Sequence, residues 1–161
     1  MDSIDKYLVN YFDSSFNLNN TEIETVHEKT FENNVNLELI NLNKNKIDFV
    51  QLNAFHDLKI LNKLTLSFNC LSTIENSIFK SLVNLESLEI TNNQIKLIYP
   101  NAFEGLGKLK RLILAFNQIQ YLYPETFNGL VEMNLLVLSF NCNLFFISFI
   151  AFFYSFFVSF S

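Results

Sequence analysis

Apolar residues recur along most of the chain with a period of 24 residues. An asparagine marks each period, and it stands at Asn45, Asn69, Asn93, Asn117 and Asn141. Apolar residues occupy the positions eight, five and three before each of these asparagines. In the four complete periods they also occupy positions two, five, ten and thirteen after it, and position +10 is always Phe. A fixed period of this length predicts a solenoid, in which each repeat is one unit that stacks on the next.

The residues just before each asparagine predict a short β-strand. Leu64 and Leu66, for example, alternate with Lys63, Thr65 and Ser67. Alternation with a period of two places one set of side chains on each face of a strand. No single repeat can bury its own leucines, so we expect the strands to stack in parallel about 4.8 Å apart and to bury them between repeats. We expect the Phe at +10 to fill the other, wider half of each repeat.

The period also divides the chain. Counting back 24 residues from Asn45 reaches Thr21, with Phe16 and Leu18 before it, which predicts a degenerate first repeat. After Asn141 the apolar pattern stops. The predicted organisation is an N-terminal segment (1–12), a repeat domain (13–143) and an apolar tail (144–161). The repeat domain consists of a degenerate first repeat (13–36), four full repeats (37–132) and a partial repeat (133–143).

The pattern L-x-x-L-x-L-x-x-N-x-L, seen between Leu61 and Leu71, resembles the leucine-rich repeat. The 24-residue length and the segments 98–103 and 122–127 are similar to the typical subclass of animal cell-surface and extracellular receptors, such as Toll-like and Slit-like proteins. The resemblance covers roughly residues 13–143. It implies an α/β fold, a leucine-rich-repeat solenoid shaped as a curved horseshoe arc. A parallel β-sheet would form the concave face, with short 3-10 or irregular segments on the convex face.

We interpret the five recurring asparagines as structural. The chain must turn sharply after each strand, which leaves backbone groups facing inward. A side-chain amide both donates and accepts hydrogen bonds, so a stacked ladder of Asn side chains can satisfy these groups.

In this family the solvent-facing strand residues form the usual binding surface, so the resemblance implies a concave face that binds a protein ligand. The side chains of this concave face come from the positions six, four, two and one before each recurring asparagine. They become more apolar toward Ile113, Phe116 and Val137, as expected of a binding patch, or of a surface that further repeats or a cap cover. The residues predicted to form this face are Lys63, Thr65, Phe68, Ser87, Glu89, Thr91, Arg111, Ile113, Phe116 and Val137.

Composition and charge narrow the classes of function. The net charge is −5 and the pI is about 5.0, which leaves no basic surface for nucleic acid. His27 and His56 lie in different repeats, and neither has a second His or Cys at the spacing of a zinc site. The spacing indicates neither a Ser, His and acid set nor a phosphate-binding glycine loop. We therefore expect a protein that is not an enzyme and that holds no metal or cofactor.

Two cysteines and one sequon bear on the compartment. Cys70 and Cys142 follow the marker asparagine in repeats that are three units apart, so stacking separates them by roughly 15 Å. A disulfide needs at most about 7 Å between Cα atoms, so both are expected to be free thiols. The triplet Asn19-Asn20-Thr21 makes Asn19 a candidate N-glycosylation site.

Both ends of the chain depart from the repeat. Residues 144–160 contain no charge, Pro or Gly, and these seventeen residues reach the lower limit of a membrane span. Three interpretations of this tail stay open: a membrane segment, non-coding sequence read in frame, or an unusual cap. The first residues lack the basic and apolar regions of a signal peptide. Either the protein is cytoplasmic, or its true N-terminus precedes residue 1.

The sequence thus predicts a non-catalytic protein–protein interaction module, part of a receptor or extracellular recognition protein, whose rigid repeats display a binding surface. The alternatives are an intracellular leucine-rich-repeat scaffold and a form tethered to a membrane through residues 144–160. The repeat subclass favours an extracellular or cell-surface location, whereas the free thiols favour the scaffold. The sequence does not indicate the identity of the ligand or the oligomeric state.

Overall fold

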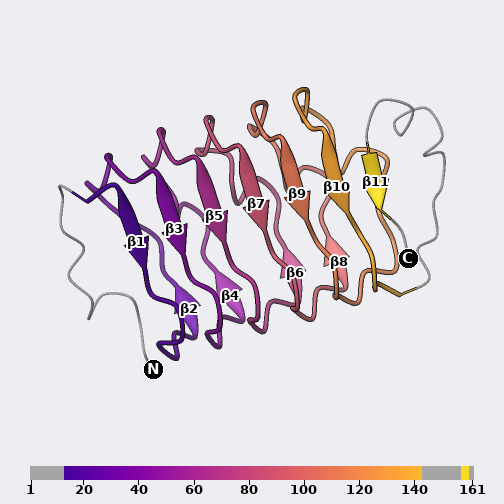
Figure 1. The fold of residues 1–161 in the computed structure, drawn as a ribbon, viewed down its shortest axis with the longest axis horizontal. Coiled ribbons are helices and arrows are strands. Elements are labelled where there is room, and N and C mark those ends of the chain that lie inside the picture. Colours follow the sequence, from indigo (N-terminus) through magenta and orange to yellow (C-terminus); the bar gives the residue numbers. More distant parts are fainter. Residues whose placement is uncertain (1–12, 143–156, 160–161) are drawn as a thin grey trace.

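The computed structural model of the protein describes residues 13–142 and 157–159, which form a solenoid (Figure 1). Seven short strands form one parallel sheet along one side of it. They are β1 (Ser15–Asn17), β3 (Leu39–Asn41), β5 (Lys63–Thr65), β7 (Ser87–Glu89), β9 (Arg111–Ile113), β10 (Leu135–Val137) and β11 (Phe157–Ser159). The solenoid and its parallel sheet confirm the fold class predicted from the sequence.

The strands from β1 to β10 pair in the register of the 24-residue period. Ile40 lies opposite Leu64, and Leu64 lies opposite Leu88. The central residue of each of these strands is buried. Because side chains alternate along a strand, the residues on either side of it lie on the outer face of the sheet. We call this outer surface the concave face.

The sheet continues beyond the last repeat. β11 pairs in parallel with β10, and Val158 lies opposite Leu136. Its three residues belong to the apolar tail. The rest of the tail, residues 143–156 and 160–161, and the N-terminal segment 1–12 lie outside the described residues.

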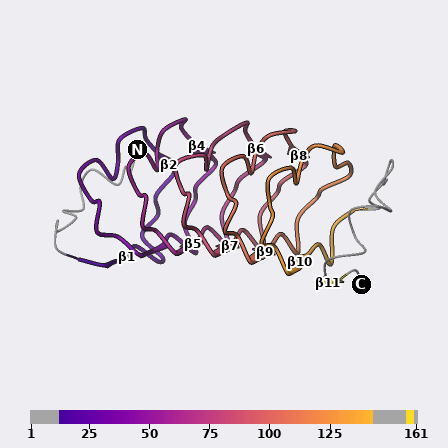
Figure 2. The same ribbon diagram turned by 90° about the horizontal axis from the view of Figure 1, so that it is seen from above.

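The opposite, convex side carries turns and four two-residue strands (Figure 2). β2 (Thr25–Val26) pairs with β4 (Phe49–Val50), and β6 (Thr73–Ile74) pairs with β8 (Leu97–Ile98). The sequence predicted 3-10 or irregular segments here, and within the described part of the chain the structure has turns and strands but no helix. Stacking brings equivalent residues of adjacent repeats side by side on both sides of the solenoid. Where two neighbouring repeats are both extended on the convex side, as at β2 and β4 or at β6 and β8, their backbone groups can pair.

The core between the two sides consists of leucines and a column of phenylalanine rings. The Phe at position +10 of each repeat is almost fully buried, and Phe31 of the first repeat continues the column. Consecutive rings from Phe31 to Phe127 lie 6.0–6.3 Å apart between centroids, with interplanar angles of 22° or less. Each fully buried Phe or Leu contributes roughly 1.5–3 kcal/mol. This energy exists only when neighbouring repeats are in contact.

The recurring asparagines link each repeat to the one before it. Asn69 is buried, and its Nδ2 donates to the Leu42 carbonyl of the preceding repeat (3.0 Å) and to the Leu66 carbonyl of its own repeat (3.1 Å). Its Oδ1 accepts from the Ile47 N–H at 3.0 Å. The same two links to the preceding repeat recur at Asn45, Asn93, Asn117 and Asn141. The ladder therefore pairs backbone groups that the turn would otherwise leave buried and unbonded.

Replacing Asn117 by alanine should lower the free energy of unfolding by at least about 1–3 kcal/mol, because the Ile90 carbonyl and the Ile95 N–H lose a buried partner. The control is Asn128→Ala in an exposed turn of the same repeat, which should change the free energy by less than about 0.5 kcal/mol. Urea unfolding followed by circular dichroism measures both values. Equal effects of the two substitutions would contradict a structural role for Asn117.

Candidate functional site

The structure brings the ten predicted site residues together on the concave face. Seven of them lie in strands and three in the turns that follow β5, β7 and β9. Arg111, Phe68 and Phe116 are exposed. Six others are half-buried, namely Lys63, Ser87, Glu89, Thr91, Ile113 and Val137.

Thr65 corrects the prediction at one position. It lies on the concave face, but only 5% of it is exposed. Its Oγ1 donates to the Asn41 Oδ1 at 3.0 Å, across the β3–β5 pair. A short side chain between longer neighbours, engaged in a hydrogen bond of its own, offers little surface to a partner.

The structure adds Phe140 to the face. Its ring stacks on that of Phe116, with centroids 4.2 Å apart and an interplanar angle of 10°. Phe116 is 47% exposed and Phe140 57% exposed, so the two rings form an exposed apolar patch just after β9 and β10. Phe140 holds the same position in its repeat as Phe68 and Phe116, and this shared position is the sequence signal that points to it.

The residue directly before each ladder asparagine adopts a left-handed backbone conformation. The φ angles lie between +54° and +60° at Lys44, Phe68, Asn92, Phe116 and Phe140. Asn tolerates this region, whereas a bulky side chain there is strained by about 1–2 kcal/mol. The three phenylalanines are also about half exposed, so their rings gain only part of the energy of burial. The fold by itself would favour Asn at these positions.

Charged residues on and beside the concave face are mostly paired. Lys63 Nζ lies 2.9 Å from Glu89 Oε1, and Lys110 Nζ lies 2.9 Å from Glu86 Oε1. The hydrogen bond from Lys110 is the largest cause that holds the pKa of the Glu86 carboxyl below its ordinary value. Both ion pairs are partly exposed, so solvent screens them and each contributes little to stability. Arg111 has no ion pair with any described residue.

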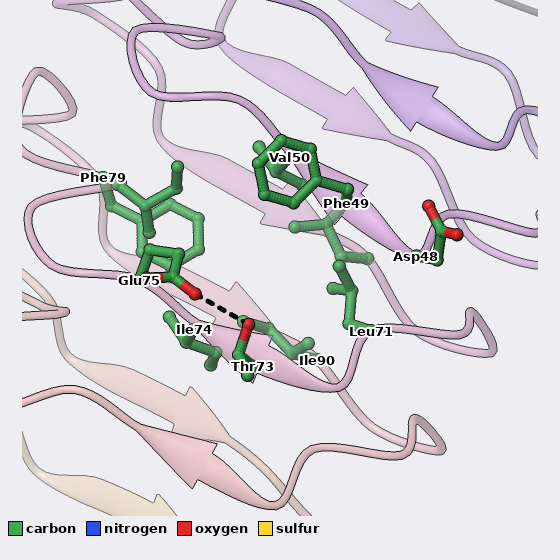
Figure 3. Close-up of a pocket in the computed structure, with 11 residues that line it drawn as sticks. Asp48, Phe49, Val50, Leu71, Thr73, Ile74, Glu75, Phe79 and Ile90 are labelled. Carbon is green, nitrogen blue, oxygen red and sulfur yellow. Dashed lines mark hydrogen bonds between the residues drawn. The ribbon is translucent and has the colours of Figure 1, made fainter.

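The convex side offers no comparable site in the described residues. Figure 3 shows a cavity between β4 and β6, at the point where the convex strands do not pair, lined by residues such as Phe49, Leu71 and Phe79. Its volume of about 20 Å³ holds little more than one water molecule. Two depressions of about 260 and 250 Å³ lie around His56, and both are smaller than an ordinary ligand pocket.

The two cysteines and the candidate glycosylation residue Asn19 are not among the concave face residues named above. Cys70 is half-buried and Cys142 is exposed, and both are free thiols. Asn19 is exposed in the first repeat. No group of three or more metal-binding side chains occurs within residues 13–142 and 157–159. No helix in these same residues is long and apolar enough to span a membrane.

Comparison with known proteins agrees with this geometry. Residues 14–71 and 60–119 each match the model of a family described as leucine rich repeat. The two matches overlap and together cover more than half of the chain. No curated protein matches the chain.

Replacing Phe68 by asparagine should change the free energy of unfolding by less than about 1 kcal/mol, because relief of left-handed strain offsets the lost ring contacts. Phe103→Ala, which removes a fully buried ring from the stacked column, should cost about 3–5 kcal/mol. Thermal and urea unfolding of both variants test this contrast. A loss at Phe68 as large as that at Phe103 would show that the exposed ring is part of the core.

Replacing Lys110 by methionine should raise the pKa of Glu86 toward its ordinary value, because the carboxylate loses its main hydrogen-bond donor. Carbon-detected NMR titration of the Glu side chains measures this pKa. A lowered pKa in the folded state means that the pair stabilises the fold above the ordinary carboxyl pKa, and that this stabilisation is lost as the pH falls through the lowered value. An unchanged Glu86 pKa in the variant would contradict the assigned cause.

Proposed function

The chain belongs to the leucine-rich repeat family, and on this premise we propose that it is a non-catalytic module that binds another protein through the concave face. Domains of this family are generally protein-interaction modules. The observation that carries the proposal is the exposed Phe116–Phe140 pair together with the exposed Arg111, which begins the strand β9 that Phe116 follows. Aromatic residues and Arg are enriched among the residues that dominate binding energy in protein interfaces.

The rigidity of the sheet supports binding at this face. In the seven-stranded sheet, β3, β5, β7, β9 and β10 are each paired with a strand on both sides, and the central residue of each of these five strands is buried. The outer side chains therefore project from a backbone that is already ordered. Binding then requires little loss of backbone entropy, so more of the contact energy appears as affinity.

The chemistry of the face fits recognition better than catalysis. The face carries ion pairs and apolar rings. A flat surface with aromatic and Arg side chains at one end is suited to contact a protein chain.

We propose an extracellular or cell-surface setting, as part of a receptor or recognition protein. The 24-residue repeat subclass and the exposed Asn19 in its sequon support this setting. The alternative is an intracellular scaffold, which the free thiols of Cys70 and Cys142 favour. Tethering to a membrane through residues 144–160 is a further alternative, and it depends on a segment that lies largely outside the described residues.

Site-specific photo-cross-linking tests the binding face. A benzophenone amino acid is placed at Phe116 in the full chain, and the matched control carries it at Phe49, an equally exposed Phe on the convex strand β4. After irradiation in extracts of the source organism, we expect a discrete cross-linked protein from position 116 that is absent from position 49. Identical products from both positions, or none from position 116, would contradict binding through the concave face.

A further inference from the structure

Two exposed cations on the concave face, Lys44 and Arg111, form no ion pair with a described residue. Lys63 and Lys110 each contact a carboxylate at 2.9 Å, and these contacts occupy Glu89 and Glu86. Arg111 instead lies between Ser87 of β7 and Leu135 of β10, neither of which is charged. The chain as a whole carries a net charge of −5, yet this exposed guanidinium has no ion pair within the described part of the chain.

The surroundings of Arg111 are apolar on the side toward β10. Ile113 and Val137 lie opposite each other in the register, and the Phe116–Phe140 pair follows at the ends of the same two strands. The preceding repeat has the polar residues Ser87, Glu89 and Asn92 at the positions that Arg111, Ile113 and Phe116 hold in the next one. Because β11 continues the sheet past β10, this surface lies within the sheet and not on its last strand.

Folding does not account for this combination of side chains. An exposed Arg contributes little to stability, and an exposed Phe at positive φ is strained where Asn would be favoured. A bound partner would account for both, because a carboxylate forms paired hydrogen bonds with a guanidinium and an apolar side chain covers the rings. Arg111 therefore calls for a carboxylate on the partner, and the exposed rings call for an apolar side chain.

We propose that the partner presents an extended segment in which an acidic residue lies close to a large apolar residue, and that this segment binds over β9 and β10. Arg111 receives the carboxylate, and the Phe116–Phe140 pair receives the apolar side chain. Phe116 comes five positions after Arg111, which corresponds to about 16 Å of strand. The two groups of the partner are therefore within about five residues of each other. This assignment rests on the proposed function, because it specifies the ligand of the same face.

A displayed library of random 12-residue peptides, selected on the full 161-residue chain, tests the assignment. Selected peptides are synthesised, and their affinities are measured by fluorescence anisotropy for the wild type and for the variants R111Q and F116N. The matched controls are K63Q and F68N, which change the same positions two repeats earlier in the solenoid. A convex variant, F49N, reports on binding away from the concave face. Thermal unfolding verifies that each variant is folded.

The expected peptides contain Asp or Glu within five residues of a large apolar residue. Changing that acid to its amide should weaken binding to the wild type about fivefold and to R111Q less than twofold. F116N should weaken binding, and K63Q and F68N, two repeats away on the same face, should weaken it less than R111Q and F116N do. The convex variant F49N should leave the affinity unchanged.

Several results would overturn the assignment. The assignment of a carboxylate to Arg111 is wrong if the selected peptides lack an acid, or if the amide change has the same effect on the wild type and R111Q. A loss of binding in F116N would in that case still support binding at the concave face. Self-association of the chain that F116N abolishes would make a second copy the occupant instead. If F49N alone weakens binding, or no peptide depends on Phe116, both this assignment and the proposed function fail.

Discussion

Stacking of each repeat on the next is the interaction on which the rest of the structure depends. A single repeat has no interior of its own, since its leucines, its Phe and its inward-facing backbone groups are all covered by the adjacent repeat. The rings from Phe31 to Phe127 pack at 6.0–6.3 Å, and the ladder asparagines donate to carbonyls of the preceding repeat. One spacing of 24 residues satisfies both the apolar contacts and the hydrogen bonds, so a change in that spacing would disrupt the two together.

The same stacking leaves the concave face free to vary. The central residue of each strand supplies the burial, and the ladder asparagine holds the turn, so the outer side chains are not needed for folding. This explains how Phe116 can occupy a left-handed position where Asn92 stands one repeat earlier. It also explains how Arg111 can replace Ser87 at equivalent positions without a counter-ion. The differences between adjacent repeats on this face are therefore not required by the fold, as the proposed binding role would have it.

Much of the fold could be predicted because the period specifies which residues are buried. Leu64 and Leu88 lie opposite each other as their equivalent positions require, and the Phe at +10 is in the core. The site could be predicted less completely. Thr65 alternates correctly onto the outer face, but its hydrogen bond to Asn41 and its longer neighbours cover it. The stacking of Phe140 on Phe116 depends on the geometry of two adjacent turns, which a pattern of residue types does not contain.

By itself, the sequence determined the repeat, the parallel sheet, the buried columns and the face on which each strand residue lies. These follow from periodicity, because a period of two within a strand and of 24 between strands assigns every position to one face and one neighbour. The tertiary structure alone decided which outer residues are accessible, which charges are paired and which are not, how the convex strands pair, and that residues 157–159 extend the sheet. These properties depend on distances between side chains and between backbone segments of different repeats, and such distances exist only once the repeats are stacked.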